Sequence, residues 1–142
     1  MSERAAELAA SGPRAAGNEA RYRELIADIA AGSRLHYGPP GEDPNFELLL
    51  GDQRYAQGLA KVAELGDLEA TAELADLISL VAQAQAAGSL ELADAIWEAG
   101  AVAVGWGTSD RHEAAKQLAR EGGSGAAAAL LEAARARRGL SG

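Results

Sequence analysis

The sequence of 142 residues predicts an all-α fold, a mostly antiparallel bundle of about six or seven helices in one domain. Three observations lead to this prediction. Apolar residues recur at i, i+3 and i+4 through most of the chain, which is the period of an amphipathic helix. Capping residues and glycines mark where these segments begin and end. No stretch has the alternation typical of a strand, and the short connections favour antiparallel neighbours.

The N-terminal residues 1–17 are rich in alanine and are expected to form a frayed turn or two of helix, or to be disordered as a terminal tail. A single helical domain is then expected over residues 18–142. Asn18 is a candidate cap for a helix from Glu19 to about Ala31, and Gly32 is expected to end this helix.

Residues 33–43 are expected to form a loop, because Pro39 and Pro40 exclude helix there. His36 and Tyr37 fall in this loop, just before the two prolines. Packing within the loop is the simpler interpretation of His36.

The best-specified stretch runs from Asp43 to Gly88 and predicts two helices joined at a tight corner. Asp43 is a candidate cap with Pro44 at the first helical position, and Gly66 ends the first helix. Asp67 then caps the second helix, which Gly88 ends. The first helix also contains Gly51 and Gly58, each costing up to ~1 kcal/mol against alanine, so we expect something to pack closely there.

The C-terminal third predicts three shorter helices. Ser89 is the expected cap of a helix from Leu90 to about Val104. Asp110 and Glu113 form an expected capping box for a helix over residues 111–121. A last helix is expected from Ala126 to about Arg138.

Composition narrows the classes of function. The net charge of −8 argues against a general binder of nucleic acids or anionic membranes, since both favour a positive surface. Cysteine is absent, which excludes disulfides and cysteine metal sites. No run reaches the ~18 apolar residues of a transmembrane segment, and the first residues lack a signal-peptide core. We therefore expect a cytoplasmic protein, and the many small alanines make it a candidate subunit.

Common catalytic motifs are absent from the sequence, including the nucleophile elbow, the P-loop and H-E-x-x-H. The two histidines lie far apart along the chain, and solvent exposure is the simpler interpretation of His112. Asp52 follows an apolar run inside a predicted helix, which favours partial burial. Asp76 and Asp94 are expected on solvated helix faces.

Small and apolar residues follow a definite order within residues 43–88. Those that carry it are Leu48, Leu49, Leu50, Gly51, Asp52, Ala56, Gly58, Leu59, Ala60, Leu65, Gly66, Asp67, Leu74, Ala75, Leu77 and Ile78. This order resembles the trans-polyprenyl diphosphate synthase family, in which an apolar helix with a Leu-x-Gly-Asp segment ends at a Gly-Asp corner. Residues 98–105 are similar to the small-residue helix before that family's second Asp-rich motif.

The sequence departs from the catalytic members where their metal ligands stand. Residues 36–44 replace the first Asp-rich motif, and Trp106 to Ser109 with the single Asp110 replace the second. Such a chain cannot by itself build a site with several hard oxygen ligands for Mg²⁺. The resemblance implies a truncated isoprenoid-synthase-like bundle with no catalytic residue, metal or cofactor of its own.

By this resemblance, the chain is expected to be the non-catalytic, regulatory small subunit of a heteromeric heptaprenyl- or hexaprenyl-type synthase. It would pair with a catalytic prenyl diphosphate synthase subunit, which binds Mg²⁺, and would help to set activity and product length in isoprenoid biosynthesis. The expected partner interface comprises Leu49, Asp52, Ala56, Gly58, Leu59, Leu74 and Ile78. Phe46, His36 and Tyr37 are expected to contact the elongation tunnel or a loop.

Two alternatives stay open at this stage. One is a helical interaction or scaffold protein unrelated to isoprenoid synthesis. The other is a stand-alone enzyme with a site around His36, Tyr37, Glu42 and Asp52. If Gly58 serves a partner interface, a bulky substitution there is expected to weaken partner binding more than the isolated fold.

Overall fold

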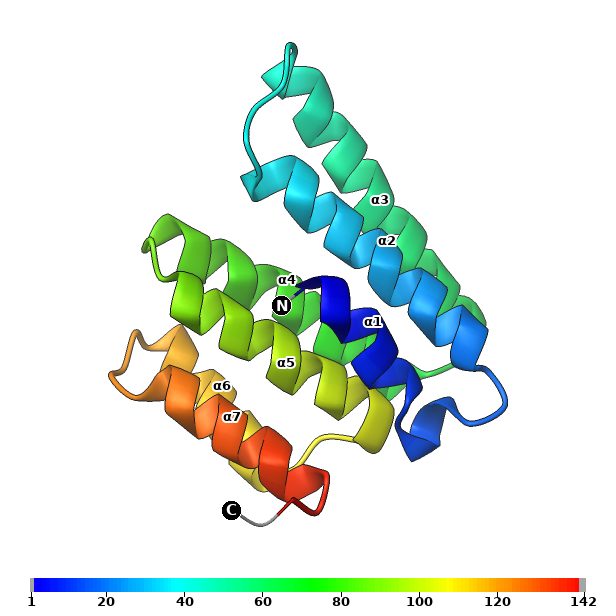
Figure 1. The fold of residues 1–142 in the computed structure, drawn as a ribbon, viewed down its shortest axis with the longest axis vertical. Coiled ribbons are helices and arrows are strands. Elements are labelled where there is room, and N and C mark those ends of the chain that lie inside the picture. The colour runs from blue at the N-terminus through cyan, green and yellow to red at the C-terminus, as the bar shows by residue number, and fades with distance from the viewer. Residues whose placement is uncertain (1, 141–142) are drawn as a thin grey trace.

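The computed structural model describes residues 2–140, which form seven α-helices, one short 3-10 helix and no strand (Figure 1). The all-α prediction with six or seven helices is confirmed. The elements are α1 (Ser2–Ala10), η1 (Pro13–Ala15), α2 (Glu19–Tyr37), α3 (Pro44–Glu64), α4 (Leu68–Ala86), α5 (Leu90–Trp106), α6 (Asp110–Arg120) and α7 (Ala126–Arg137).

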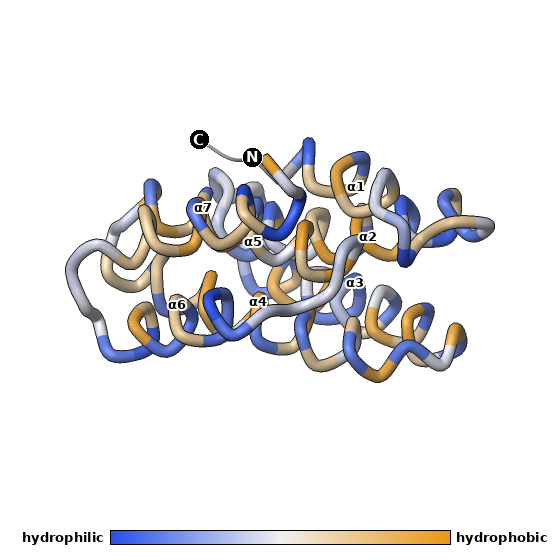
Figure 2. The backbone as a smooth tube through the Cα atoms, turned by 90° about the horizontal axis from the view of Figure 1, so that it is seen from below, coloured by the Kyte–Doolittle hydropathy of each residue, from blue (hydrophilic) through white to orange (hydrophobic). Residues whose placement is uncertain are grey.

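The helices form two layers, which Figure 2 shows from the side. One layer contains α7, α5, α1 and α2, and the other contains α6, α4 and α3. The hairpins α2–α3, α4–α5 and α6–α7 each connect the two layers, and their helices pack on one another. Helix α1 fills the space between α2 and α5 and contacts both.

Helix α5 is the centre of the core and packs against α1, α4, α7 and η1. Small residues allow this close approach. A Cβ added at Gly100 would lie 2.6 Å from the Leu77 Cδ1 atom of α4, and one at Gly105 would lie 2.5 Å from the Ala9 carbonyl oxygen of α1. Close packing of small residues therefore offsets the shortage of bulky apolar side chains.

The N-terminal segment belongs to the folded domain. Ala5 and Ala9 of α1 and Ala15 of η1 have no exposed surface. The Arg14 guanidinium donates to the Val104 carbonyl oxygen at 2.8 Å and so ties η1 to the end of α5. Residues 2–17 therefore contribute to the core of the bundle, because α1 supplies alanines that pack against α2 and α5.

Gly32 does not end α2, which continues to Tyr37, so the expected loop over residues 33–43 is too long. The reason is close packing. Gly32 is buried where α2 crosses α3, and a Cβ there would lie 2.7 Å from the Tyr55 ring and 2.9 Å from the Gly51 carbonyl oxygen. His36 and Tyr37 consequently stand on the last turn of a helix and not in a loop.

Most predicted helix starts are confirmed. Asp43, Asp67 and Ser89 each accept a hydrogen bond from the backbone N–H three residues later. Helix α6 differs, because Ser109 and not Asp110 is its cap and accepts from the His112 N–H at 3.1 Å. The Glu113 carboxylate instead accepts from the Thr108 hydroxyl, which takes it out of the expected capping box.

Candidate protein-binding surface

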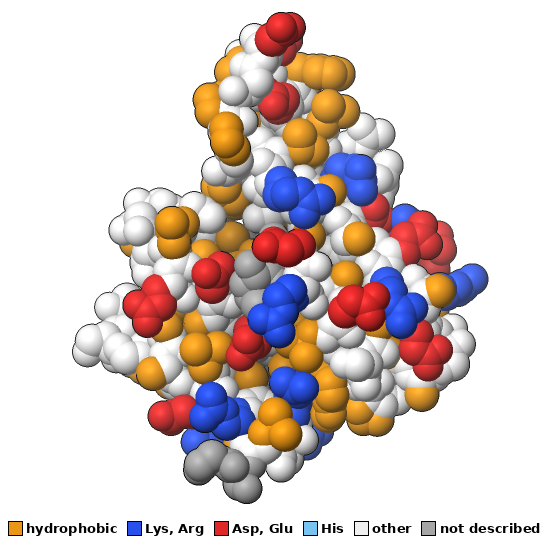
Figure 3. Space-filling model, viewed as in Figure 1, with side chains coloured by type: hydrophobic (Ala, Val, Ile, Leu, Met, Phe, Trp, Pro, Cys, Tyr) orange, Lys and Arg blue, Asp and Glu red, His pale blue; other side chains and the backbone are white. Residues whose placement is uncertain are grey.

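The hairpin α2–α3 extends beyond the rest of the molecule, and its outer end carries exposed apolar side chains (Figures 1 and 3). We define the hairpin tip as Tyr37, Phe46, Leu48 and Leu49. Phe46 is 55% exposed and Leu49 is 65% exposed. Several large apolar side chains are thus exposed near one end of the molecule, as at many interaction sites.

Local hydrogen bonds hold the segment that leads into the hairpin tip. The Asp43 carboxylate accepts from the Phe46 N–H at 3.1 Å and caps α3. The Glu47 carboxylate accepts from the Gly41 N–H at 2.8 Å and draws the proline segment back onto the first turn of α3. The apolar side chains of α3 therefore start from an ordered helix end, which lowers the entropy cost of binding a partner.

A polar contact ties the two helices together just below the hairpin tip. His36 Nε2 lies 2.9 Å from Asp52 Oδ1, and the His36 ring packs on Tyr55 with 5.2 Å between ring centroids. Burial raises the pKa of Tyr55 to about 12, and the nearby Tyr37 and Asp52 add to this rise. Asp52 is itself exposed, so the expected partial burial is wrong. Leu48 and Leu49 in the apolar run before it are exposed as well.

The structure brings only part of the alternative enzyme site together. His36 and Asp52 are in contact, and the Tyr37 ring lies tilted beside the His36 ring with 5.7 Å between their centroids. Glu42 lies in the exposed connecting segment and makes no hydrogen bond or ion pair with another described residue. The remaining pair is a surface contact between two helix faces.

The expected interface residues divide between surface and core. Leu49, Asp52 and Ala56 are exposed along the outer side of α3. Gly58 is buried against α2, where an added Cβ would lie 2.7 Å from the Ile29 Cδ1 atom, and Leu74 is completely buried in the main core. These two residues offer no surface to a partner, since their own chain already covers them. Leu59 and Ile78 are half-buried and pack against the same core.

A buried ionic network between α4 and α6 was missed by sequence reasoning. Lys116 Nζ lies 3.0 Å from Glu73 Oε1 and 2.8 Å from Asp76 Oδ2, and His112 Nε2 lies 3.0 Å from Glu73 Oε2. His112 is only 4% exposed, so the expected solvation of this residue is wrong, and Asp76 is paired as well. The spacing of acids on α4 and bases on α6 was the available signal, but only tertiary packing sets them face to face.

Electrostatics favours the charged state of this network. Burial alone would lower the pKa of Lys116, but hydrogen bonds and charges from Asp76, Glu73 and Glu113 outweigh it and raise that pKa. Contact with Lys116 in turn lowers the pKa of Asp76 against the opposing effect of burial. The charged side chains of this network therefore hold α4 and α6 together.

The same network contains donors that could suit a cation. One ligand atom each from Glu73, His112 and Glu113 lie within 4.8 Å of one another. The Lys116 ammonium, however, lies 3.0 Å from Glu73 and 3.1 Å from Glu113 and already neutralises these carboxylates. A metal ion would have to displace a buried positive charge, so these residues fit a structural role better than a metal site.

Comparisons with protein-family models, curated proteins and solved structures found no match for this chain. Within residues 2–140, no helix combines the length and apolar character needed to cross a bilayer.

Proposed function

We propose that this chain is a non-catalytic binding subunit whose hairpin tip docks on a partner protein. The exposed apolar side chains of the hairpin tip carry this proposal. Removing apolar surface from water is worth roughly 25 cal/mol per Å², so association that covers Phe46 and Leu49 is favourable. The hairpin also stands clear of the bundle on one side, which leaves room for a partner (Figure 1).

The resemblance within residues 43–88 supplies the partner class in this proposal, a catalytic prenyl diphosphate synthase subunit that holds Mg²⁺ through its own aspartates. Leu49, Asp52 and Ala56 would face that subunit, because they lie on the exposed side of α3. The pairing would support chain elongation and limit product length. A scaffold role unrelated to isoprenoids is the second candidate, since the same apolar tip would serve it.

Co-expression with a catalytic subunit that has both Asp-rich motifs tests the proposal. We expect the two chains to co-purify, and the pair to give more elongation activity or a different product length than the catalytic subunit alone. Co-purification without any change in elongation would favour the scaffold role. If neither binding nor activity depends on this chain, the prenyl synthase assignment is wrong.

A matched pair of variants tests the surface. The double substitution Phe46→Glu with Leu49→Glu places charge on the hairpin tip and should reduce partner binding at least about tenfold, because burying an unpaired charge is costly. Leu68→Glu is the control, since Leu68 is 81% exposed at the start of α4, beyond the far end of α3 and about 30 Å from the hairpin tip. Circular dichroism should show the same helix content in both variants. Equal loss of binding in the control would rule out the hairpin tip as the docking surface.

A further inference from the structure

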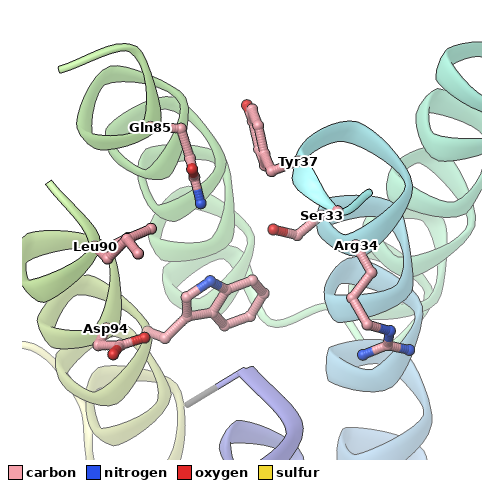
Figure 4. Close-up of a pocket in the computed structure, with 9 residues that line it drawn as sticks. Ser33, Arg34, Tyr37, Gln85, Leu90 and Asp94 are labelled. Atoms are coloured by element: carbon pink, nitrogen blue, oxygen red, sulfur yellow. The ribbon is translucent and has the colours of Figure 1, made fainter. Parts of the chain in front are cut away.

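A cleft lies between α2 and the α4–α5 hairpin, beyond the point where α1 separates them (Figure 4). Its volume is about 210 Å³, which is smaller than the roughly 300–1,000 Å³ of pockets that take drug-sized ligands. At about 30 Å³ for each water, roughly seven water molecules would fill it. The space suits a ligand with a single ring and one small polar group.

The walls of the cleft combine apolar surface with hydrogen-bond donors. Leu90 and the ring of Tyr37 stand on opposite sides, and the Gln85 amide and the Ser33 hydroxyl point into the space between them (Figure 4). Trp97 also lines the cleft. A flat apolar body would contact these side chains on both of its faces.

Trp97 places an unpaired hydrogen-bond donor at the cleft. Its side chain is 96% buried, since only 4% is exposed, yet the indole N–H has no acceptor among residues 2–140. Among the described residues, only the Arg54 Nε atom is both fully enclosed and unpaired. The indole nitrogen of Trp97 therefore keeps some accessible surface, which is open toward the cleft that Trp97 lines. The indole N–H can therefore donate to water in the cleft, or to a ligand oxygen that takes the place of that water.

Two charged residues line the cleft, Arg34 and Asp94, and only the positive one is without an ion-pair partner among the described residues. Arg34 lies at the rim and forms no ion pair with a described residue. Asp94 lies at the opposite rim and already has an interaction within the chain. The guanidinium of Arg34 points away from the cleft in Figure 4, and this long, exposed side chain would turn it inward to pair with an anionic group.

From this geometry we propose that the cleft binds a small ring-containing carboxylate. The ring lies between Leu90, Tyr37 and Trp97, an oxygen accepts from the indole N–H, and the carboxylate pairs with Arg34. This site goes beyond the proposed partner binding and does not depend on it, because the cleft is complete in the isolated chain.

Titration of the purified chain with benzoate tests the site. The readout is the indole N–H resonance of Trp97 in a two-dimensional ¹⁵N spectrum, identified by its persistence in a Trp106→Phe variant. We expect a saturable shift of the Trp97 signal with benzoate. Benzyl alcohol, which lacks the charge, and acetate, which lacks the ring, should bind at least about tenfold more weakly.

A matched pair of arginine variants tests the role of charge. Arg34→Gln should weaken benzoate binding about tenfold or more, because a charge-assisted hydrogen bond is lost. Arg21→Gln is the control on the same helix, far from the cleft, and should leave the affinity unchanged. The proposal is overturned if benzoate gives no saturable shift, if benzyl alcohol binds as tightly, or if both variants behave alike. Partner binding is not measured in this experiment, so its outcome leaves the proposed function untouched.

Discussion

Asp67 performs two tasks at the junction of three helical segments. Its carboxylate caps α4 by accepting from the Ala70 N–H at 3.0 Å. The same carboxylate accepts from the Arg14 guanidinium at 2.6 Å and from the Tyr22 hydroxyl at 2.7 Å. Burial opposes ionisation, but these hydrogen bonds outweigh it and lower the pKa of Asp67 from 3.8. A local capping residue thereby fixes η1 and α2 against the start of α4.

Replacing Asp67 by asparagine tests this arrangement. Asparagine also caps helices, so the substitution mainly removes the charge. Because the folded pKa of Asp67 is depressed, its stabilisation is present above about pH 3.8 and is lost as the pH falls through the folded value. We expect Asp67→Asn to lower the unfolding free energy by about 1–3 kcal/mol at neutral pH, and the difference to shrink in acid. Urea unfolding of the wild type and the variant, at neutral pH and in acid, measures this difference in unfolding free energy. A difference that is the same at both pH values would contradict the charge argument.

Gly58 illustrates how a single absent side chain sets the distance between two helices. A Cβ at this position would lie 2.7 Å from Ile29 Cδ1 and 2.9 Å from the Leu25 carbonyl oxygen. The second contact is with backbone, which cannot move aside as a side chain can. The glycine thus serves packing of α3 on α2, and we no longer expect it to act mainly at a partner interface.

Gly58→Leu should therefore destabilise the isolated chain by about 2 kcal/mol or more, although leucine favours helix more than glycine does. Ala56→Leu is the matched control, because Ala56 is exposed on the same helix, and it should change stability little. Chemical denaturation of each variant gives the comparison. If Gly58→Leu unfolds like the wild type while partner binding is lost, α2 and α3 must separate more easily than this packing indicates.

At the scale of elements, ionic networks add to the packing at two helix crossings. Lys116 joins α6 to α4, and Lys61 joins α3 to α2 through Asp28 at 2.6 Å and Glu24 at 2.8 Å. Asp28 also accepts from Arg54 at 3.0 Å, and its buried carboxylate is therefore held by two cations. At both crossings the buried carboxylate is therefore paired with a cation, as a charge removed from water requires.

Lys116→Met is expected to destabilise the fold by about 3 kcal/mol, because the buried Glu73 carboxylate loses its main cation. The double variant with Glu73→Gln should recover part of this loss, since the uncompensated charge is then gone. Thermal unfolding of both variants and of wild type measures the coupling between the two sites. A double variant that is less stable than Lys116→Met would show that the lysine acts through packing and not through charge.

At the scale of the whole molecule, the free energy needed for local opening of the backbone is expected to decrease from α5 outward. Helix α5 contacts α1, α4, α7 and η1, whereas α3 packs mainly on α2 and its first turns are exposed. Local opening requires little free energy where few apolar contacts are lost. The hairpin tip lies at the outer end of this gradient, where the caps of the first turn of α3 are its main local support.

Native-state hydrogen exchange tests this gradient. Backbone amides in the middle of α5, around Val102, should exchange most slowly, and those around Leu49 in α3 should exchange much faster. Addition of the catalytic partner should slow exchange around Leu49 and leave Val102 unchanged, if the hairpin tip is the docking surface. Protection that appears first in α6 or α7 would instead place the interface on the C-terminal hairpin.

The sequence alone determined the helical class and most helix ends, because caps such as Asp43 and Ser89 act within a few residues of themselves. It also marked Gly51 and Gly58 as points of close packing, and the structure shows that α2 is the neighbour. The role of Gly32 could not be predicted. In the sequence, a glycine that ends a helix cannot be distinguished from one that lets a second helix pack closely, because the position of the second helix is unknown.

Tertiary structure alone decided which polar residues meet. His36 and Asp52 are separated by 16 residues and His112 and Glu73 by 39, and no local periodicity links such positions. The cleft beside Trp97 and the exposure of the hairpin tip are likewise products of how the three hairpins stack. Local physics fixes each helix and its ends, whereas sites and surfaces depend on contacts between segments far apart in the chain.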